Sequence, residues 1–164
     1  MVSPTMDSDP RLVAMARRII DDNRYVTLGT ADGDGNPWVT PVFFTPVDHR
    51  EIYWVSSPDS THSRNLAVRP QVRLVVFDST VPVGRGEAVY MAARAGLVPD
   101  GEIRDCAAVF SARLPGLREF GVDDLTGGAS LRLYRALVTE HSVLIRGGDP
   151  TYGRELDSRV VVAL

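Results

Sequence analysis

The chain has 164 residues, of which 44% are hydrophobic and 24% are charged, a composition typical of a globular protein with one substantial core. Its 18 basic and 21 acidic residues give a formal net charge of −3, so it lacks the basic surplus of a nucleic-acid-binding protein. No apolar run approaches the roughly 20 residues that a transmembrane helix requires. We therefore expect a single domain over residues 1–164 that binds neither nucleic acid nor membrane.

The N-terminal residues lack the basic stretch and apolar block of a secretory signal. We expect residues 1–8 to form a loose N-terminal segment and the protein to be cytoplasmic. The one cysteine, Cys106, cannot form an internal disulfide, and we expect it to be a small apolar residue of a helix.

The first regular element is predicted at Asp9 and Pro10, which form an N-cap and first-turn pair. Apolar residues then recur at helical spacing through residues 10–23, as in an amphipathic helix packed on a core. The period next changes to two, which indicates β-rich runs over residues 25–30, 37–47 and 51–57. We interpret these runs as three antiparallel strands joined by short hairpins.

The second half of the chain continues with helices and strands in alternation. A short helix over residues 61–70 is ended by Pro70, and a second helix over residues 100–114 has Ile103, Ala107 and Phe110 on one face. Further strands are predicted over residues 71–79, 84–98, 130–146 and 158–164. Within the second of these, we expect Gly84 and Gly86 to permit a bulge or a close backbone approach.

These elements predict a mainly β (α+β) fold. Six to seven mostly antiparallel strands with two to three flanking helices favour a closed or partly closed barrel, because closure removes exposed strand edges.

Two patterns that could bind metal are weak. Asp32 to Asn36 have the spacing that begins a calcium loop, but Pro37 and Phe43 stand where the loop needs glycine and glutamate, so we predict a hairpin turn. The histidines are scattered and no second cysteine is present, so we predict no metal site; His49 is expected in a turn and His141 on a strand face. No serine lies in a G-x-S-x-G elbow, so the sequence gives no support for a hydrolase triad.

The segment SSPDSTHSRNL, residues 56–66, is the strongest candidate site. Ser56 and Ser57 end a strand, and the following helix begins with the polar residues His62, Ser63, Arg64 and Asn65. Hydroxyls, free N–H groups and a guanidinium could converge there on one phosphate. The same residue types are also favoured as a plain helix N-cap, so the residues alone leave both interpretations open.

The order of these pieces resembles the pyridoxamine 5′-phosphate oxidase-like family of FMN-binding split β-barrels. The resemblance covers about residues 9–146, and its most specific element is the strand and phosphate loop followed by His62, Ser63, Arg64, Asn65, Leu66, Pro70 and Val72. It implies a split barrel and a homodimer with FMN in a groove between the subunits.

The resemblance also assigns positions around the cofactor. Thr40, Pro41, Val42 and Phe43 match the strand beside the isoalloxazine, and Ser56 and Ser57 match the strand end that binds phosphate. The basic cluster beyond it is matched by His62, Ser63, Arg64 and Asn65, with His62 at the position usually taken by Lys or Arg. The resemblance therefore favours the phosphate interpretation.

The resemblance implies that true oxidases of this family hold their vitamin substrate with a C-terminal tail rich in Trp and in Arg or His. The C-terminal residues of this chain lack that pattern. We therefore do not expect a true pyridoxamine phosphate oxidase, but an FMN-dependent oxidoreductase acting on an unknown small molecule. The alternatives are a reductase using a deazaflavin coenzyme and a non-catalytic flavin-binding or stress-related module. Heme handling lacks the support of a His-rich tail or a Cys–Pro pair.

No catalytic acid or base stands out in the sequence. Trp38, Tyr134 and Arg135 are candidate substrate contacts, although strand residues of these types more often serve packing or surface roles.

Overall fold

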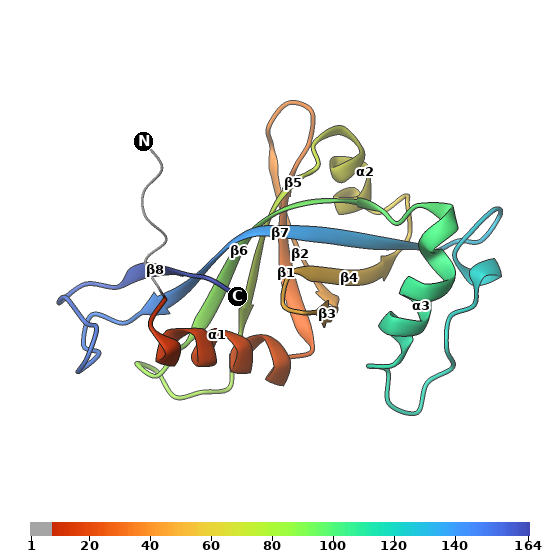
Figure 1. The fold of residues 1–164 in the computed structure, drawn as a ribbon. Helices are drawn as coiled ribbons and strands as arrows, with labels where there is room; N and C mark the ends of the chain where they lie inside the picture. The colour runs from red at the N-terminus through yellow and green to blue at the C-terminus, as the bar shows by residue number, and fades with distance from the viewer. Residues whose placement is uncertain (1–7) are drawn as a thin grey trace.

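The computed structural model describes residues 8–164, so all of the predicted loose segment except Ser8 lies outside the described residues. Ser8 itself is held in place, because its hydroxyl accepts a hydrogen bond of 2.8 Å from the Ala163 N–H. Over the described range, antiparallel strands curl into a half-barrel that is flanked by helices (Figure 1). The mainly β split-barrel prediction is confirmed.

One sheet contains all eight strands of the described range. They are β1 (Tyr25–Ala31), β2 (Pro37–Phe43), β3 (Thr45–Val47), β4 (Glu51–Ser56), β5 (Gln71–Phe77), β6 (Ala88–Leu97), β7 (Arg132–Ile145) and β8 (Ser158–Val162). The helices are α1 (Pro10–Asp22), α2 (Thr61–Val68) and α3 (Ile103–Ser111), with short 3₁₀ turns at Asp100–Glu102 and Val122–Asp124. Seven strands follow the order β2-β1-β5-β6-β7-β4-β3, and β8 pairs with β7.

The predicted meander of three strands is wrong in one respect. β1–β2 and β3–β4 are hairpins, but the run 37–47 breaks at Phe44, and β2 and β3 lie at opposite ends of the strand order. Phe44 and Thr45 are both buried, so two consecutive side chains face the interior and the alternation of a continuous strand is lost. The sheet curls so far that β2 and β4 approach one another, which lets the chain cross between the edges in one step.

The predictions for two glycine-containing segments had different outcomes. Asp32 to Asn36 form the β1–β2 hairpin turn as predicted, with Asp32 Oδ1 accepting from the Asp34 and Asn36 N–H groups at 2.9 Å. Gly84 and Gly86, by contrast, do not lie within a strand, because β6 begins only at Ala88. Gly84 has φ +80° in a turn before the strand, a conformation that glycine adopts without strain.

Helix α1 begins as predicted. The Asp9 carboxylate caps it by accepting from the Arg11 N–H at 2.8 Å, and Pro10 occupies the first turn. Its apolar face lies against the strands and packs into the barrel core through Leu12, Ala16, Ile19 and Ile20. Burial of this face stabilises the helix on the sheet more than its intrinsic propensity does.

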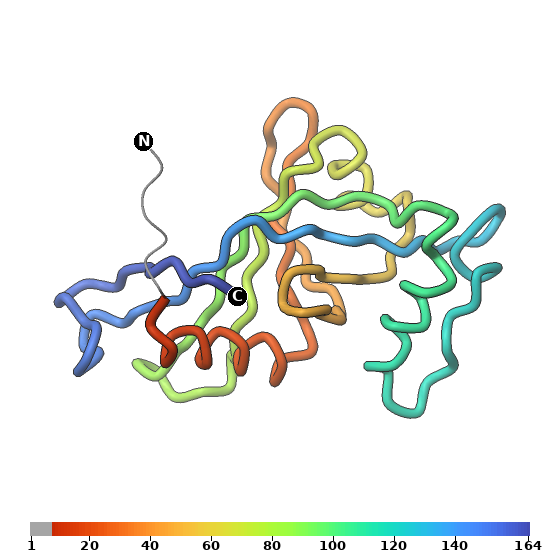
Figure 2. Tube along the Cα trace, in the orientation of Figure 1, coloured from red at the N-terminus to blue at the C-terminus, as the bar shows by residue number. Residues whose placement is uncertain are grey.

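Helix α3 lies beside the end of the sheet where β7 begins (Figure 2). Its buried residues belong to a second hydrophobic cluster, which also includes Tyr53 of β4 and Leu133 of β7. Ile103, Ala107 and Phe110 are buried in it, which confirms the predicted face. Cys106 is also buried there, with its Sγ 3.6 Å from the Tyr53 hydroxyl, and so has the expected packing role.

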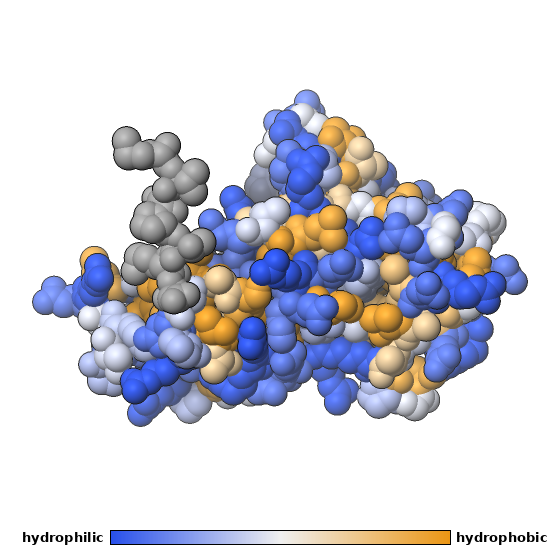
Figure 3. Space-filling view, viewed as in Figure 1, coloured by the Kyte–Doolittle hydropathy of each residue, from blue (hydrophilic) through white to orange (hydrophobic). Residues whose placement is uncertain are grey.

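The surface combines polar and apolar regions. Hydrophobic surface on the side shown in Figure 3 is divided into separate patches by polar residues. No helix in residues 8–164 is long and apolar enough to cross a membrane.

Arg113, just after α3, joins the two clusters. Its guanidinium donates to the carbonyl oxygens of Phe44 at 3.0 Å, and of Asp21 and Asn23 at 2.7 Å each. It also lies over the Phe44 ring, 4.8 Å from the centroid. The side chain therefore satisfies carbonyls that the end of α1 leaves free and fixes the crossing between β2 and β3.

We predict that Arg113→Ala lowers the free energy of unfolding by about 2 kcal/mol or more, because several part-buried carbonyls lose their donor. Arg113→Lys should recover only part of this loss, since one ammonium cannot match the planar fork. Urea denaturation measures both changes.

Arg118→Ala is the matched control, because its side chain is 77% exposed and pairs with Asp124 at the surface. It should cost less than about 1 kcal/mol. Equal losses for Arg113→Ala and Arg118→Ala would contradict the role given to Arg113.

Candidate functional site

The segment SSPDSTHSRNL forms a helix cap at the end of a strand. Ser56 is the last residue of β4, Ser57 begins the loop, and α2 starts at Thr61. The N-cap is Ser60, whose Oγ accepts from the Ser63 N–H at 3.4 Å. Sequence reasoning did not single out Ser60, although a serine three residues before the capped N–H is a recognisable signal.

His62 ties the strand end to the helix. Its Nε2 lies 2.9 Å from Ser56 Oγ and 3.1 Å from Ser60 Oγ. Ser60 Oγ also donates to Ser63 Oγ at 2.8 Å, so hydroxyls from both sides of the loop meet at one imidazole. The side chains of Ser56, Ser60, His62 and Ser63 form a connected polar cluster, the serine cluster, that positions the start of α2 beside the end of β4.

The imidazole of His62 supplies little positive charge to this cluster. The side chain is buried, and burial lowers its pKa below the usual 6.5 because a charged ring would lose its hydration. His62 is therefore neutral near pH 7. At this position of the expected basic cluster, the side chain forms hydrogen bonds but adds no positive charge.

Arg64 and Asn65 differ sharply in exposure. Arg64 is exposed, and one of its guanidinium N–H groups donates to the Asp59 carbonyl. Asn65 is buried, and its Nδ2 donates to Thr30 Oγ1 at 3.1 Å, so it fastens α2 to β1. Of the predicted residues 62–65, Arg64 is the one that offers an accessible charge.

Arg69, just after α2, binds the β1–β2 turn and not the serine cluster. Its guanidinium donates to the carbonyls of Asp32 at 2.7 Å and Gly33 at 2.8 Å. These bonds hold the β1–β2 hairpin turn against the end of α2.

The predicted ring-binding residues Thr40, Pro41, Val42 and Phe43 lie on β2, at one end of the strand order. Within residues 8–164, β2 pairs with β1 alone, so its other edge is unpaired. Pro41 is exposed and has no N–H to contribute, which suits an edge strand. Because α2 packs against both β1 and β2, the serine cluster and this edge belong to one region of the surface.

Side chains of the edge strand point in different directions. Val42 is buried in the barrel core, whereas the Phe43 ring packs edge-to-face against Phe110 of the second cluster, with centroids 5.8 Å apart. Trp38 is 47% exposed, and its Nε1 donates to Thr40 Oγ1 at 2.6 Å. Trp38 and Thr40 therefore present a joined polar and aromatic surface at this edge.

Two further candidate contacts have structural roles. Tyr134 is buried and stacks on Trp54, with ring centroids 5.7 Å apart, so it packs in the core. Arg135 donates to the Glu102 carboxylate at 2.7 Å and to the Tyr53 hydroxyl at 3.4 Å. These hydrogen bonds raise the pKa of Arg135 and fasten the turn before α3 to β7.

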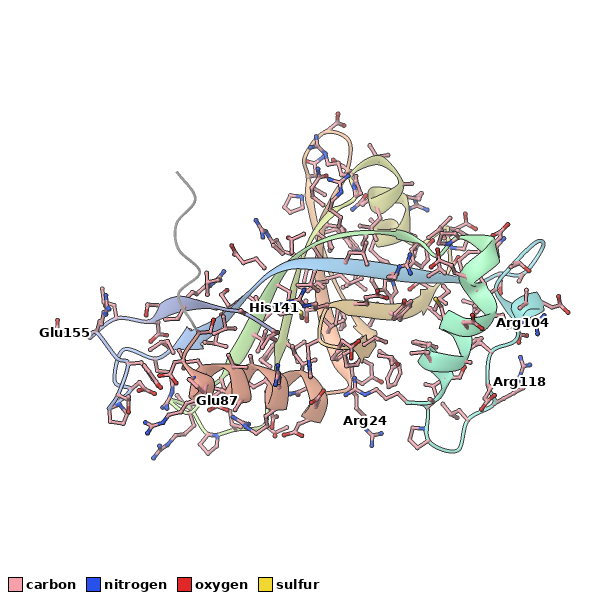
Figure 4. All side chains as sticks on the ribbon, viewed as in Figure 1. Arg24, Glu87, Arg104, Arg118, His141 and Glu155 are labelled. Atoms are coloured by element: carbon pink, nitrogen blue, oxygen red, sulfur yellow. The ribbon has the colours of Figure 1, made fainter. Side chains whose placement is uncertain are left out.

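The remaining histidines lie together outside the serine cluster. His49 is in a turn with φ +56°, and its Nε2 is 3.0 Å from Asp21 Oδ1. His141, on β7 near the middle of the molecule (Figure 4), donates through Nε2 to the His49 carbonyl at 2.7 Å. Over residues 8–164, no three His, Cys, Asp or Glu side chains gather as a metal site would require.

Comparison with known proteins relates this site to one family. The family described as pyridoxamine 5′-phosphate oxidase matches residues 12–123, which include the edge strand and the serine cluster. No curated protein matches the chain.

Several solved structures share the fold. A heme binding protein from Mycobacterium smegmatis is 16% identical with a TM-score of 0.67; the match covers 98% of this chain and 60% of that protein. HutZ, the heme storage protein from Vibrio cholerae, is 21% identical with a TM-score of 0.62, covering 82% of this chain and 92% of HutZ. A FAD-binding protein from Mesorhizobium loti is 22% identical with a TM-score of 0.61, covering 79% and 91%. At these identities the similarity shows a common fold.

The buried histidines predict a stability that falls in acid. Burial lowers the pKa of His62 and of His141 below 6.5, so the unfolded chain binds protons that the folded chain does not. Their contribution is complete above pH 6.5 and is lost as the pH falls towards their folded pKa values. Each histidine adds a slope of at most about 1.4 kcal/mol per pH unit.

We expect His62→Gln to flatten this slope between pH 7 and pH 5 in urea denaturation. At pH 8 the same comparison measures the hydrogen bonds alone, because the imidazole is neutral in both states. An unchanged slope in the variant would show that His62 is not a buried neutral group.

Proposed function

The chain belongs to the pyridoxamine 5′-phosphate oxidase family, and from this premise we propose that it is an FMN-dependent oxidoreductase acting on a small molecule. The observation that carries the proposal is the meeting of serine hydroxyls, a helix N-terminus and one accessible arginine beside an unpaired strand edge.

The chemistry of these groups fits a phosphate monoester. Ser56 and Ser57 are half-buried, so their hydroxyls can donate to phosphate oxygens while remaining accessible. The first N–H groups of α2 have no intrahelical acceptor and carry the positive end of the helix dipole. Arg64 adds a guanidinium, so we assign these groups to phosphate binding, with His62, Ser63 and Asn65 holding them in position.

The edge strand suits the flavin ring. Alternate residues among Thr40, Pro41, Val42 and Phe43 direct their backbone groups away from β1, along the free edge of β2, and these groups can meet the polar rim of an isoalloxazine. The bound flavin would supply the hydride or electron chemistry, and the protein would supply position and electrostatics. No residue is assigned as a catalytic acid or base.

Other cofactors fit the same region less well. A deazaflavin coenzyme has a longer acidic tail that needs more basic residues, and Arg69 is already bonded to the β1–β2 turn. Heme would need an axial ligand, and Nε2 is hydrogen-bonded in each of His49, His62 and His141. A non-catalytic flavin-binding module stays an alternative, because neutral His62 reduces the charge available to hold a phosphate.

We also propose a homodimer with the cofactor between the subunits. The outward side chains of β1, β5 and β6 are exposed or half-buried, as on a sheet face that another molecule can cover. A cytoplasmic location stays a prediction of the sequence.

The absorbance spectrum of the purified protein tests the cofactor. We expect the two visible bands of oxidised flavin, retained through gel filtration or restored by adding FMN. A single deazaflavin band after incubation with that coenzyme would support the reductase alternative. Failure to bind either compound in titration would rule out both enzymes.

Arg64→Ala tests the phosphate assignment. The variant should bind FMN roughly tenfold more weakly or worse, and riboflavin about as well as the wild type does, because one charge-assisted contact acts only on the phosphate. Fluorescence quenching of each flavin measures the two affinities. Arg104→Ala is the matched control, since Arg104 is exposed on α3, away from α2 (Figure 4). Equal losses of FMN and riboflavin would contradict the assignment.

A further inference from the structure

The tip of the β1–β2 hairpin projects beyond the rest of the sheet. Over the part of the chain that the structure describes, β1 pairs with β5 only at residues 27–29, whereas its pairing with β2 continues to Ala31 and Pro37. Residues 30–38 therefore form a two-stranded ribbon, which rises beside α2 in Figure 1. Because two strands alone are marginally stable in water, the position of this ribbon depends on contacts outside the sheet.

Helix α2 supplies such contacts from one face. Asn65 Nδ2 donates to Thr30 Oγ1 at 3.1 Å, where the ribbon begins. The Arg69 guanidinium donates to the carbonyls of Asp32 at 2.7 Å and Gly33 at 2.8 Å, where the ribbon turns. Asn65 and Arg69 are four residues apart, and the Arg69 N–H donates to the Asn65 carbonyl at 2.7 Å. The ribbon is thus attached at two points to one rigid element.

The same helix begins at the serine cluster. Ser60 caps α2 and His62 binds it to the end of β4, so its N-terminal end is fixed at the proposed phosphate site. The ribbon continues through Trp38 towards Thr40, the first residue of β2 that we assign to the flavin ring. Trp38 Nε1 also donates to Thr40 Oγ1 at 2.6 Å. Helix α2 therefore connects the two halves of the proposed cofactor site.

We propose that Arg69 is a positioning residue, which aligns the ring-binding strand with the phosphate site and does not contact the cofactor. The inference rests on the proposed function and adds the contact that holds its two halves in register. A ligand with both a ring and a phosphate gains affinity when the two subsites have a fixed separation, because its second group then binds at a high effective concentration. A ligand with only one of these groups gains nothing from the alignment. Arg69 therefore favours FMN over riboflavin and over free phosphate.

Arg69→Ala tests this alignment. The dissociation constant for FMN should rise about tenfold, whereas those for riboflavin and inorganic phosphate should stay within about twofold of the wild type, because FMN alone binds both subsites. Fluorescence quenching measures the two flavins, and a phosphorus NMR titration measures inorganic phosphate. Arg69→Lys should recover part of the FMN affinity, since an ammonium can donate to the ribbon carbonyls but lacks the planar fork.

Arg146→Ala is the matched control. The Arg146 side chain also donates to a loop carbonyl, that of Gly84. This loop follows β5, whereas α2 precedes it, so the two lie at opposite ends of the strand. The variant should leave all three dissociation constants unchanged. Urea denaturation establishes that each variant is folded.

An unchanged FMN dissociation constant in Arg69→Ala would overturn the inference and leave the proposed function standing. A loss shared by FMN and inorganic phosphate would show a direct phosphate contact, and a loss shared by FMN and riboflavin would show an effect on the ring strand itself. Either result also overturns the inference. A wild type that binds no flavin would overturn the proposed function and this inference together.

Discussion

The hydrogen bonds of Arg113 hold the half-barrel in the shape on which the candidate site depends. The guanidinium is carried by the segment just after α3, and it donates to carbonyls at the end of α1 and to Phe44 at the crossing between β2 and β3, so it joins three segments. Burial lowers the pKa of Arg113, and the nearby Asp21 carboxylate opposes that shift. Phe44 directly follows the edge residues Thr40–Phe43, so the contact that fixes the crossing also fixes the end of the strand assigned to the flavin.

The serine cluster shows how one structure can serve as helix cap and as anion site. Ser60 and His62 form hydrogen bonds with each other and with the strand end, whereas Ser57 is half-buried and Arg64 is exposed. A lysine or arginine at position 62 would bring charge to the cluster, whereas the buried imidazole brings rigidity. The affinity for a phosphate then depends on hydroxyls, the helix dipole and Arg64 more than on a strong positive field.

The proposed flavin site and the proposed homodimer meet at the edge strand. Val39, Pro41 and Phe43 share one side of β2, and Thr40 and Val42 share the other, because alternate residues of a strand point to opposite sides. The strand assigned to the flavin ring therefore borders both sides of the sheet. A second copy on the outward face of the sheet would bring its own surface next to the cofactor of the first.

The sequence by itself determined the helices, most strands and the capped start of α2, because these depend on periodicity and on contacts between residues a few positions apart. The tertiary structure alone decided the break at Phe44 and the partners of Arg69, Arg113 and Arg135, because those contacts join segments 33 to 92 positions apart. The sequence around an arginine does not predict whether the side chain stabilises a turn, joins segments of a barrel or binds a ligand. Its role is fixed by which carbonyl and carboxylate oxygens the folded chain brings within hydrogen-bonding distance.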